Sequence, residues 1–163
     1  MSDEEYETEP SHVFEYPERF VVGTVGQPGE RAFYLQAVDS GAVVTVGLEK
    51  AEVLALAEGM VTLLESVGQS GAAPRPRAVD QAPLDTPFAE DFHVNELSVA
   101  WDGERVVIEA GDGEEGKLRV ALSVPETLAF VNRAETVVAA GRPECVLCGR
   151  AAGPTGHFCP RLN

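Results

Sequence analysis

The sequence predicts an α+β protein made of two β-β-β-α units, with antiparallel sheet covered by two helices. Three observations predict this class. Three runs of β-branched and aromatic residues precede one helical pattern, the same order returns about 74 residues later, and a segment rich in Gly, Ala and Pro lies between the two sets. The length of 163 residues is sufficient to bury a hydrophobic core.

The two halves align without a gap at an offset of 74 residues, with 11 identities in the 52 positions from 14 to 65. The alignment places 29–31 on 103–105, and it pairs Phe33 with Val107 as apolar counterparts. Since apolar classes and predicted elements coincide along with the identities, we interpret the halves as internal copies.

The first unit spans 12–67. Strands are predicted at 20–25, 31–38 and 42–48, with turns at 27–29 and 39–41 where Gly, Pro, Asp and Ser gather. The helix is predicted at 50–67, because Val53, Ala57, Met60 and Leu64 recur at steps of three and four, and Gly68 follows at a capping position.

The second unit spans 83–141, after a linker at 68–82. Strands are predicted at 94–101, 105–110 and 117–123, followed by a helix at 124–141. Ser123 and Glu126 have capping-box spacing and Pro125 lies in the first turn, which predicts a sharp helix start. The pattern leaves open whether the strands form two antiparallel sheets or one continuous sheet of six strands.

Charge limits the functional classes. The chain has 12 basic and 27 acidic residues, a net charge of −15, and residues 1–11 form an acidic extension that we expect to be disordered. This balance disfavours broad nucleic-acid and anionic-membrane surfaces, which need clustered Lys and Arg. The N-terminus carries acids where a signal peptide carries bases, and no apolar run is long enough to cross a bilayer. A cytoplasmic protein is therefore predicted.

The tail at 142–163 carries the one specific chemical pattern, C-x2-C-x8-H-x-C. Three thiolates and one imidazole suit a closed tetrahedral site for structural Zn²⁺, so the pattern predicts a zinc knuckle with the ligands Cys145, Cys148, His157 and Cys159. Iron bound by the same residues, a thioredoxin-type redox pair and a disulfide with one free thiol are the alternatives.

Other candidate sites are less specific. Arg31 and Arg105 follow equivalent turns and could together frame an anion site between the repeats, or could each stabilise its turn by pairing with Glu30 and Glu104. His93 lies near Glu90 and Asp91 and is either a general base or a surface histidine.

Glycines and aromatic residues outside these sites have structural interpretations. The glycines at 23, 26 and 29 do not have the spacing of a nucleotide-binding loop and predict a hairpin turn. Phe33 and Trp101 are predicted in the core or half buried in a sheet, with an interface patch as the alternative.

Several long strings in the chain resemble an uncharacterised actinobacterial family, a domain of unknown function of about this length. They are VFEYPERFVVGTVGQPGERAFYLQA, VGLEKAEVLALAE, LSVAWD with RVVIEA, and GRPECVLCGRAAGPTGHFCPRLN. The resemblance covers roughly residues 12–163 and implies metal ligation by Cys145, Cys148, His157 and Cys159, but no activity.

Three functions from different classes follow. The first is a non-enzymatic zinc-binding module that binds a protein partner, and we favour it. The second is an enzyme or small-molecule binder that uses Arg31 and Arg105 between the repeats. The third is nucleic-acid binding through the zinc knuckle, whose segment has three Arg and one Glu but belongs to an acidic chain.

Overall fold

The structure is a computed structural model that describes residues 10–26, 30–69, 80, 82–86, 89 and 90–140. The predicted extension at 1–11 and the linker at 68–82 lie mostly outside these ranges, and the tail at 142–163 lies wholly outside them. The described residues contain both helices and strands, so the predicted α+β class is confirmed. In chain order the elements are β1 (His12–Phe14), β2 (Arg19–Val25), β3 (Ala32–Asp39), β4 (Ala42–Leu48), α1 (Lys50–Ser66), β5 (Phe92–His93), β6 (Glu96–Trp101), β7 (Val106–Gly111), β8 (Lys117–Leu122) and α2 (Val124–Ala139).

Local sequence signals set the boundaries of the longer elements. The Ser123 hydroxyl accepts from the Glu126 N–H at 3.2 Å, and the Glu126 carboxylate accepts from the Ser123 N–H at 3.1 Å, which confirms the capping box of α2. Between β3 and β4, Ser40 and Gly41 have φ values of 50° and 82° and form a tight turn. The hairpin predicted from the glycines around 23–29 is present as β2 and β3, although residues 27–29 lie outside the described ranges.

The strands form two mixed sheets, with the orders β1-β8-β7-β6 and β2-β3-β4-β5. Each sheet consists of three antiparallel strands from one half and a short parallel strand from the other half. β1 pairs with β8, and β5 pairs with β4. The prediction of purely antiparallel sheet is therefore wrong at these two positions, because strands of three and two residues are too short to show a periodic pattern.

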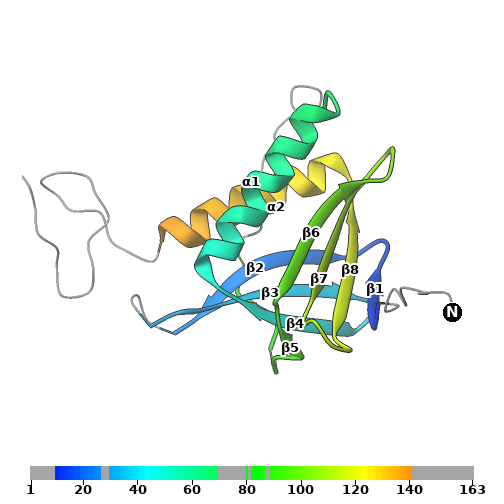
Figure 1. Cartoon of the computed structure of the whole chain (residues 1–163). Coiled ribbons are helices and arrows are strands. Elements are labelled where there is room, and N and C mark those ends of the chain that lie inside the picture. The colour runs from blue at the N-terminus through cyan, green and yellow to red at the C-terminus, as the bar shows by residue number, and fades with distance from the viewer. Residues whose placement is uncertain (1–9, 27–29, 70–79, 81, 87–88, 141–163) are drawn as a thin grey trace, which may run out of the picture.

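Each helix packs against the sheet that is built mainly from the other half of the chain. α1 packs along β6, α2 packs along β2, and the two helices contact each other (Figure 1). In Figure 1 the strands of the two sheets run in crossing directions, with both helices on the same side of the molecule. One hydrophobic core joins residues from both sheets and both helices, and Phe33 belongs to it while Trp101 packs half buried against it. The part of the chain that the structure describes contains no helix that is both long and apolar enough to span a membrane.

The structural correspondence between the halves differs from the ungapped alignment. In β3 the core contains Phe33, Leu35 and Ala37, whereas in β7 it contains Val106, Ile108 and Ala110. Phe33 therefore corresponds to Val106, and the predicted pairing with Val107 is wrong. Because side chains alternate between the two faces of a strand, a slip of one residue exchanges the faces.

We predict that Phe14 anchors the exchanged strand β1. Its side chain is 5% exposed in the common core, so Phe14→Ala should lower the free energy of unfolding by about 3 kcal/mol. Urea unfolding followed by circular dichroism measures the change. Val13→Ala is the matched control, because Val13 is 49% exposed in the same strand, and it should change stability by less than about 1 kcal/mol. Equal losses in the two variants would contradict this role for β1.

Candidate functional site

The predicted zinc ligands Cys145, Cys148, His157 and Cys159 lie outside the described residues. Within the described ranges, no group of three His, Cys, Asp or Glu side chains is arranged to hold a metal ion. Zinc binding by the tail therefore stays a prediction.

The two arginines of the predicted anion site have separate sets of contacts. Arg31 donates to the Val137 carbonyl at 3.0 Å and to the Thr24 hydroxyl at 3.4 Å, and its guanidinium lies 5.5 Å from the centre of the Phe33 ring. These contacts direct Arg31 towards the last turns of α2.

Arg105 contacts the segment that follows β1. It donates to the Glu15 carbonyl at 2.6 Å and to the Glu15 carboxylate at 3.1 Å, and its guanidinium lies 4.8 Å from the Tyr16 ring centre. A longer ion pair joins it to Asp102 at 3.9 Å, so its acidic neighbours are Glu15 and Asp102 instead of the predicted Glu104. Among the described residues, the hydrogen bonds and ring contacts of Arg31 and those of Arg105 have no residue in common.

The one-residue slip explains why the two arginines diverge. Arg31 precedes the core residue Phe33 by two positions, whereas Arg105 precedes Val107, which lies on the other face of its strand. Arg31 and Arg105 immediately precede β3 and β7, so the slip places Arg31 next to a strand whose core face begins at Phe33 and Arg105 next to one whose core face begins at Val106.

His93 lies in a small pocket together with Glu49 and Glu90. Its Nδ1 is 3.2 Å from a Glu90 carboxylate oxygen, and its Nε2 is 3.4 Å from a Glu49 carboxylate oxygen. Arg31 and Tyr34 also line this pocket of about 290 Å³. The predicted neighbourhood of His93 and Glu90 is confirmed, whereas Asp91 accepts from the Thr45 N–H instead.

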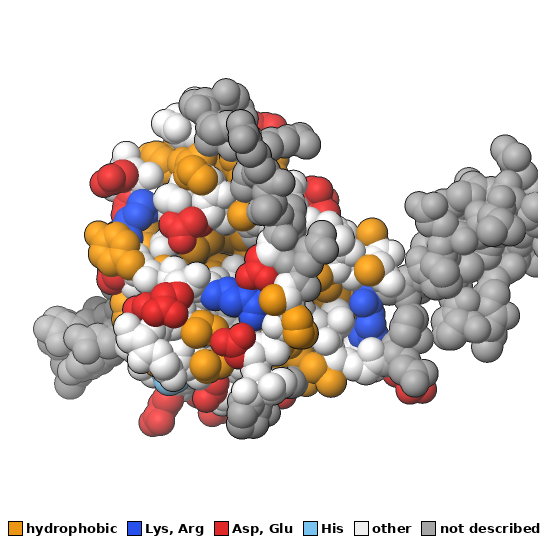
Figure 2. All heavy atoms as spheres, turned by 180° about the vertical axis from the view of Figure 1, so that it is seen from behind, with side chains coloured by type: hydrophobic (Ala, Val, Ile, Leu, Met, Phe, Trp, Pro, Cys, Tyr) orange, Lys and Arg blue, Asp and Glu red, His pale blue; other side chains and the backbone are white. Residues whose placement is uncertain are grey.

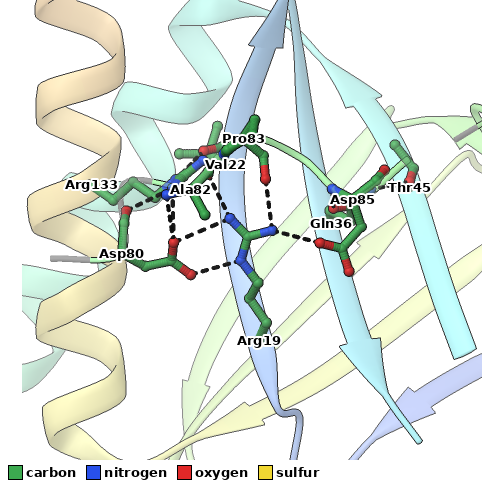
Figure 3. Close-up of polar contacts among 9 residues, drawn as sticks. All are labelled: Arg19, Val22, Gln36, Thr45, Asp80, Ala82, Pro83, Asp85 and Arg133. Carbon is green, nitrogen blue, oxygen red and sulfur yellow. Dashed lines mark hydrogen bonds and ion pairs between the residues drawn. The ribbon is translucent and has the colours of Figure 1, made fainter. Parts of the chain in front are cut away.

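The sequence did not indicate an extensive polar cluster among the described residues, which joins Arg19, Asp80 and Arg133 (Figure 3). Arg19 in β2 contacts Asp80 at 2.7 Å and Asp85 at 3.0 Å, and it also donates to the carbonyls of Ala82 and Pro83. These residues are far apart in the chain and fit no local motif, so only their spatial arrangement reveals the cluster.

Arg133 in α2 completes this cluster from the other side. Its Nε donates to the Val22 carbonyl at 2.8 Å, and its Nη1 donates to the Asp80 carbonyl at 2.6 Å. The side chain is only 7% exposed, and burial lowers the pKa of its guanidinium below the ordinary value. The helix is thereby joined both to β2 and to the segment around Asp80.

The described residues from Asp80 to Asp85, which we call the strap, are fastened to the sheet of β2–β4. The buried Gln36 side chain accepts from the Asp85 N–H at 2.7 Å and donates to the Asp85 carbonyl at 3.2 Å. Leu84 packs over Gly23 so closely that a Cβ there would lie 2.6 Å from the leucine side chain. The end of the predicted linker is therefore specifically bound to the body.

Two grooves accompany the helices. The groove between α2 and β2 has a volume of about 140 Å³, and Arg19, Asp80 and Arg133 are among its lining residues. The groove between α1 and β6 is larger, about 710 Å³, and is lined by small, apolar and acidic residues that include Leu63, Glu52 and Glu58. Figure 2, which views the molecule from behind relative to Figure 1, shows Asp and Glu side chains spread over this face, with Lys and Arg in only a few small groups.

Comparison with known families matches residues 12–159 to the family described as Protein of unknown function (DUF3090). The chain belongs to this family. The matched range includes both halves of the body and the four predicted zinc ligands. The resemblance to an uncharacterised domain family is thus confirmed. Neither the comparison with curated proteins nor that with solved structures found a match.

We predict that Asp80 stabilises the fold mainly through its negative charge. The hydrogen bond from Arg19 is the largest cause that lowers the pKa of Asp80 from its ordinary value of 3.8. The stabilisation is therefore complete at neutral pH. It decreases once the pH falls below 3.8, the ordinary pKa of Asp80, and is fully lost below the lower pKa that Asp80 has in the folded protein.

Asp80→Asn should lower the free energy of unfolding at pH 7 by about 2 kcal/mol, because Arg133 stays buried and loses the negative charge of the Asp80 carboxylate. Asp80 is 40% exposed, so the loss should be smaller than for a fully buried ion pair. Urea unfolding at pH 7 and at pH 3 measures both effects, and the difference between wild type and variant should shrink at pH 3. Glu65→Gln, at an exposed position of α1, is the control. A difference that persists unchanged at pH 3 would contradict the charge as the cause.

Proposed function

We propose that this chain is a cytoplasmic zinc-binding module that binds a protein partner and has no enzymatic activity. The carrying observation is the nature of the groove between α1 and β6, which has a volume of about 710 Å³ and is lined by apolar and acidic side chains. Such a lining suits a protein surface better than a phosphorylated metabolite, because carboxylates repel phosphate groups.

The contacts of the arginines support the same proposal. Arg19, Arg105 and Arg133 bind carboxylates and carbonyls of the chain itself. Arg31 binds the Val137 carbonyl and the Thr24 hydroxyl. An anionic ligand would have to compete with these contacts. The body is thus better suited to present its surface to another protein than to bind a small anion.

The tail contributes the proposed zinc site. Cys145, Cys148, His157 and Cys159 provide three soft sulfur donors and one imidazole, a closed ligand set typical of structural zinc. Zinc would order a segment whose sequence has no helix or strand signal, and a metal-ordered tail attached to a duplicated body forms a second surface for a partner.

We predict that Cys148→Ser removes zinc without unfolding the body. Purified wild type should contain about one zinc per chain, and the variant much less, because a tetrahedral structural site needs all four ligands. Metal analysis by mass spectrometry and far-UV circular dichroism are the measurements. Cys148→Ser should also lose any protein that copurifies with the wild type at equimolar ratio from native cells. Retention of full zinc by the variant would contradict the proposed ligand set.

A second function, small-molecule binding at His93, is favoured by one observation. His93 contacts the carboxylates of Glu49 and Glu90 in a pocket that Arg31 also lines. The Arg31 guanidinium offers a cation to an anionic ligand there, whereas the described lining of the groove between α1 and β6 contains no Lys or Arg. This arrangement corresponds to part of the predicted anion site, with Arg31 but without Arg105.

If this pocket binds phosphorylated metabolites, some of them should raise the melting temperature of the wild type, and Arg31→Gln should reduce the shift at least about threefold. Differential scanning fluorimetry with a set of sugar phosphates and nucleotides is the measurement. Arg119→Gln, which removes one arginine from β8 outside the pocket, is the control. The absence of any shift in the wild type would leave the protein-binding module as the better proposal.

A further inference from the structure

The grooves at α1 and α2 are structural counterparts. The helices begin at Lys50 and Val124, and their buried residues correspond at an offset of 74, as Leu56 with Phe130 and Met60 with Ala134. The residue of α1 that corresponds to Arg133 is therefore Gly59. Each helix packs on the edge strand of a sheet, α1 on β6 and α2 on β2, so the two grooves can be compared position by position.

In the groove of α2, the chain fills the space with its own side chains. The Arg133 Nε donates to the Val22 carbonyl on the open edge of β2, and the Asp80 carboxylate lies 3.3 Å from the same guanidinium. Phe20 and Phe130 stack beside it with ring centres 4.9 Å apart. An arginine, an acidic partner and an apolar wall thus complete this groove.

In the groove of α1 the corresponding guanidinium is missing. Gly59 has no side chain, and a Cβ built on it would meet nothing within 4 Å. The core residues Phe20 and Val22 of β2 correspond to the half-buried Leu97 and Val99 of β6. The Asp102 N–H donates to the Arg105 carbonyl, so these two residues form a hydrogen-bonded pair. Hydrogen-bonded and non-hydrogen-bonded pairs alternate along an antiparallel ladder, which makes Val99 and Ile108 a non-hydrogen-bonded pair. The Val99 carbonyl therefore faces the open edge of β6, as the Val22 carbonyl does in β2.

The charges at this groove complement a cation. Glu52 and Glu58 line it, and the lining contains no Lys or Arg among the described residues. Leu63 and Val99 contribute the apolar part of the wall. The groove of α1 therefore has the acceptors and the apolar surface that surround Arg133 in its counterpart, together with the space for the side chain.

We propose that the groove between α1 and β6 binds an arginine side chain that a partner protein presents on an apolar surface segment. The inference rests on the proposed protein-binding function and names the chemistry of the partner. The guanidinium occupies the space beside Gly59, donates to the backbone edge of β6 and pairs with the glutamates. Arginine suits this place better than lysine, because its planar fork can donate to a carbonyl and a carboxylate at once.

Other occupants match the groove less well. The extension at 1–9 has five acids and would meet Glu52 and Glu58 with like charge. A nucleic acid would bring phosphates to the same carboxylates. The tail contains Arg142, Arg150 and Arg161, and it is therefore one of the outcomes that the test separates.

The test uses a capped hexapeptide, Ser-Val-Arg-Val-Thr-Ser, and the full chain, with affinity measured by isothermal titration calorimetry. The variant Gly59→Arg should provide the missing side chain in cis and weaken peptide binding at least about tenfold. It should also keep or raise the melting temperature, because Gly disfavours a helix interior and the site has room. Leu54→Arg adds the same charge to the same helix outside the groove and should leave the affinity within about twofold.

Two altered peptides identify the recognised chemistry. Replacing Arg by citrulline keeps the planar shape and removes the charge, and replacing it by Lys keeps the charge and removes the fork. Each should weaken binding at least about fivefold. The absence of peptide binding, equal binding to Gly59→Arg, or equal affinity for the citrulline peptide would overturn the proposal.

Two outcomes would assign the groove to another occupant and overturn the proposal as well. One is peptide binding at least about tenfold tighter to a full chain with Arg142→Ser, Arg150→Ser and Arg161→Ser, which would assign the groove to the tail. The other is a dimer in sedimentation that Gly59→Arg dissociates, which would assign it to a second copy.

The full chain with Cys148→Ser separates this inference from the proposed zinc function. If the Cys148→Ser chain binds the peptide like wild type but keeps its zinc, the proposed zinc ligand set is rejected and the groove inference stands. If it loses zinc and the copurified partner while no chain binds the peptide, only the groove inference fails.

Discussion

The reciprocal exchange between the two halves is the constraint on which the rest of the structure depends. β1 extends the sheet of the second half and β5 extends the sheet of the first, while α1 covers β6 and α2 covers β2. A meander of three strands with one helix leaves sheet edges and an apolar face uncovered. Each half covers these features of the other, so a single core forms from both, and neither half has a complete core of its own.

The polar cluster around Asp80 likewise joins elements of both halves, because it binds the strap to β2 and to α2. Arg19 and Arg133 come from β2 and α2, and both bind the strap between the halves. Since a buried guanidinium is unfavourable without partners, the carbonyls of Val22 and Asp80 and the Asp80 carboxylate must surround Arg133 together. The cluster thereby determines where the chain passes from one half to the other, and it closes the groove of α2.

The differences between the halves indicate function more than their similarities do. A repeated unit places the same backbone at two grooves, yet one holds Arg133 and the other holds Gly59 at the corresponding position. One side chain thus distinguishes a groove that the chain fills itself from one that the described residues leave open. The family is described as one of unknown function, so the functional proposal rests on the chemistry of this groove and of the cysteine-rich tail.

The sequence by itself determined the elements whose signals are local. Apolar periodicity, the capping box at Ser123 and the turn at Ser40 and Gly41 depend on residues a few positions apart, and they located both helices and six of the strands. The tertiary structure alone decided the exchanged strands, the contacts of Arg105 and the Arg19–Asp80–Arg133 cluster. These depend on partners 46 or more residues away and on a one-residue slip between the repeats, and neither leaves a periodic or local pattern in the chain.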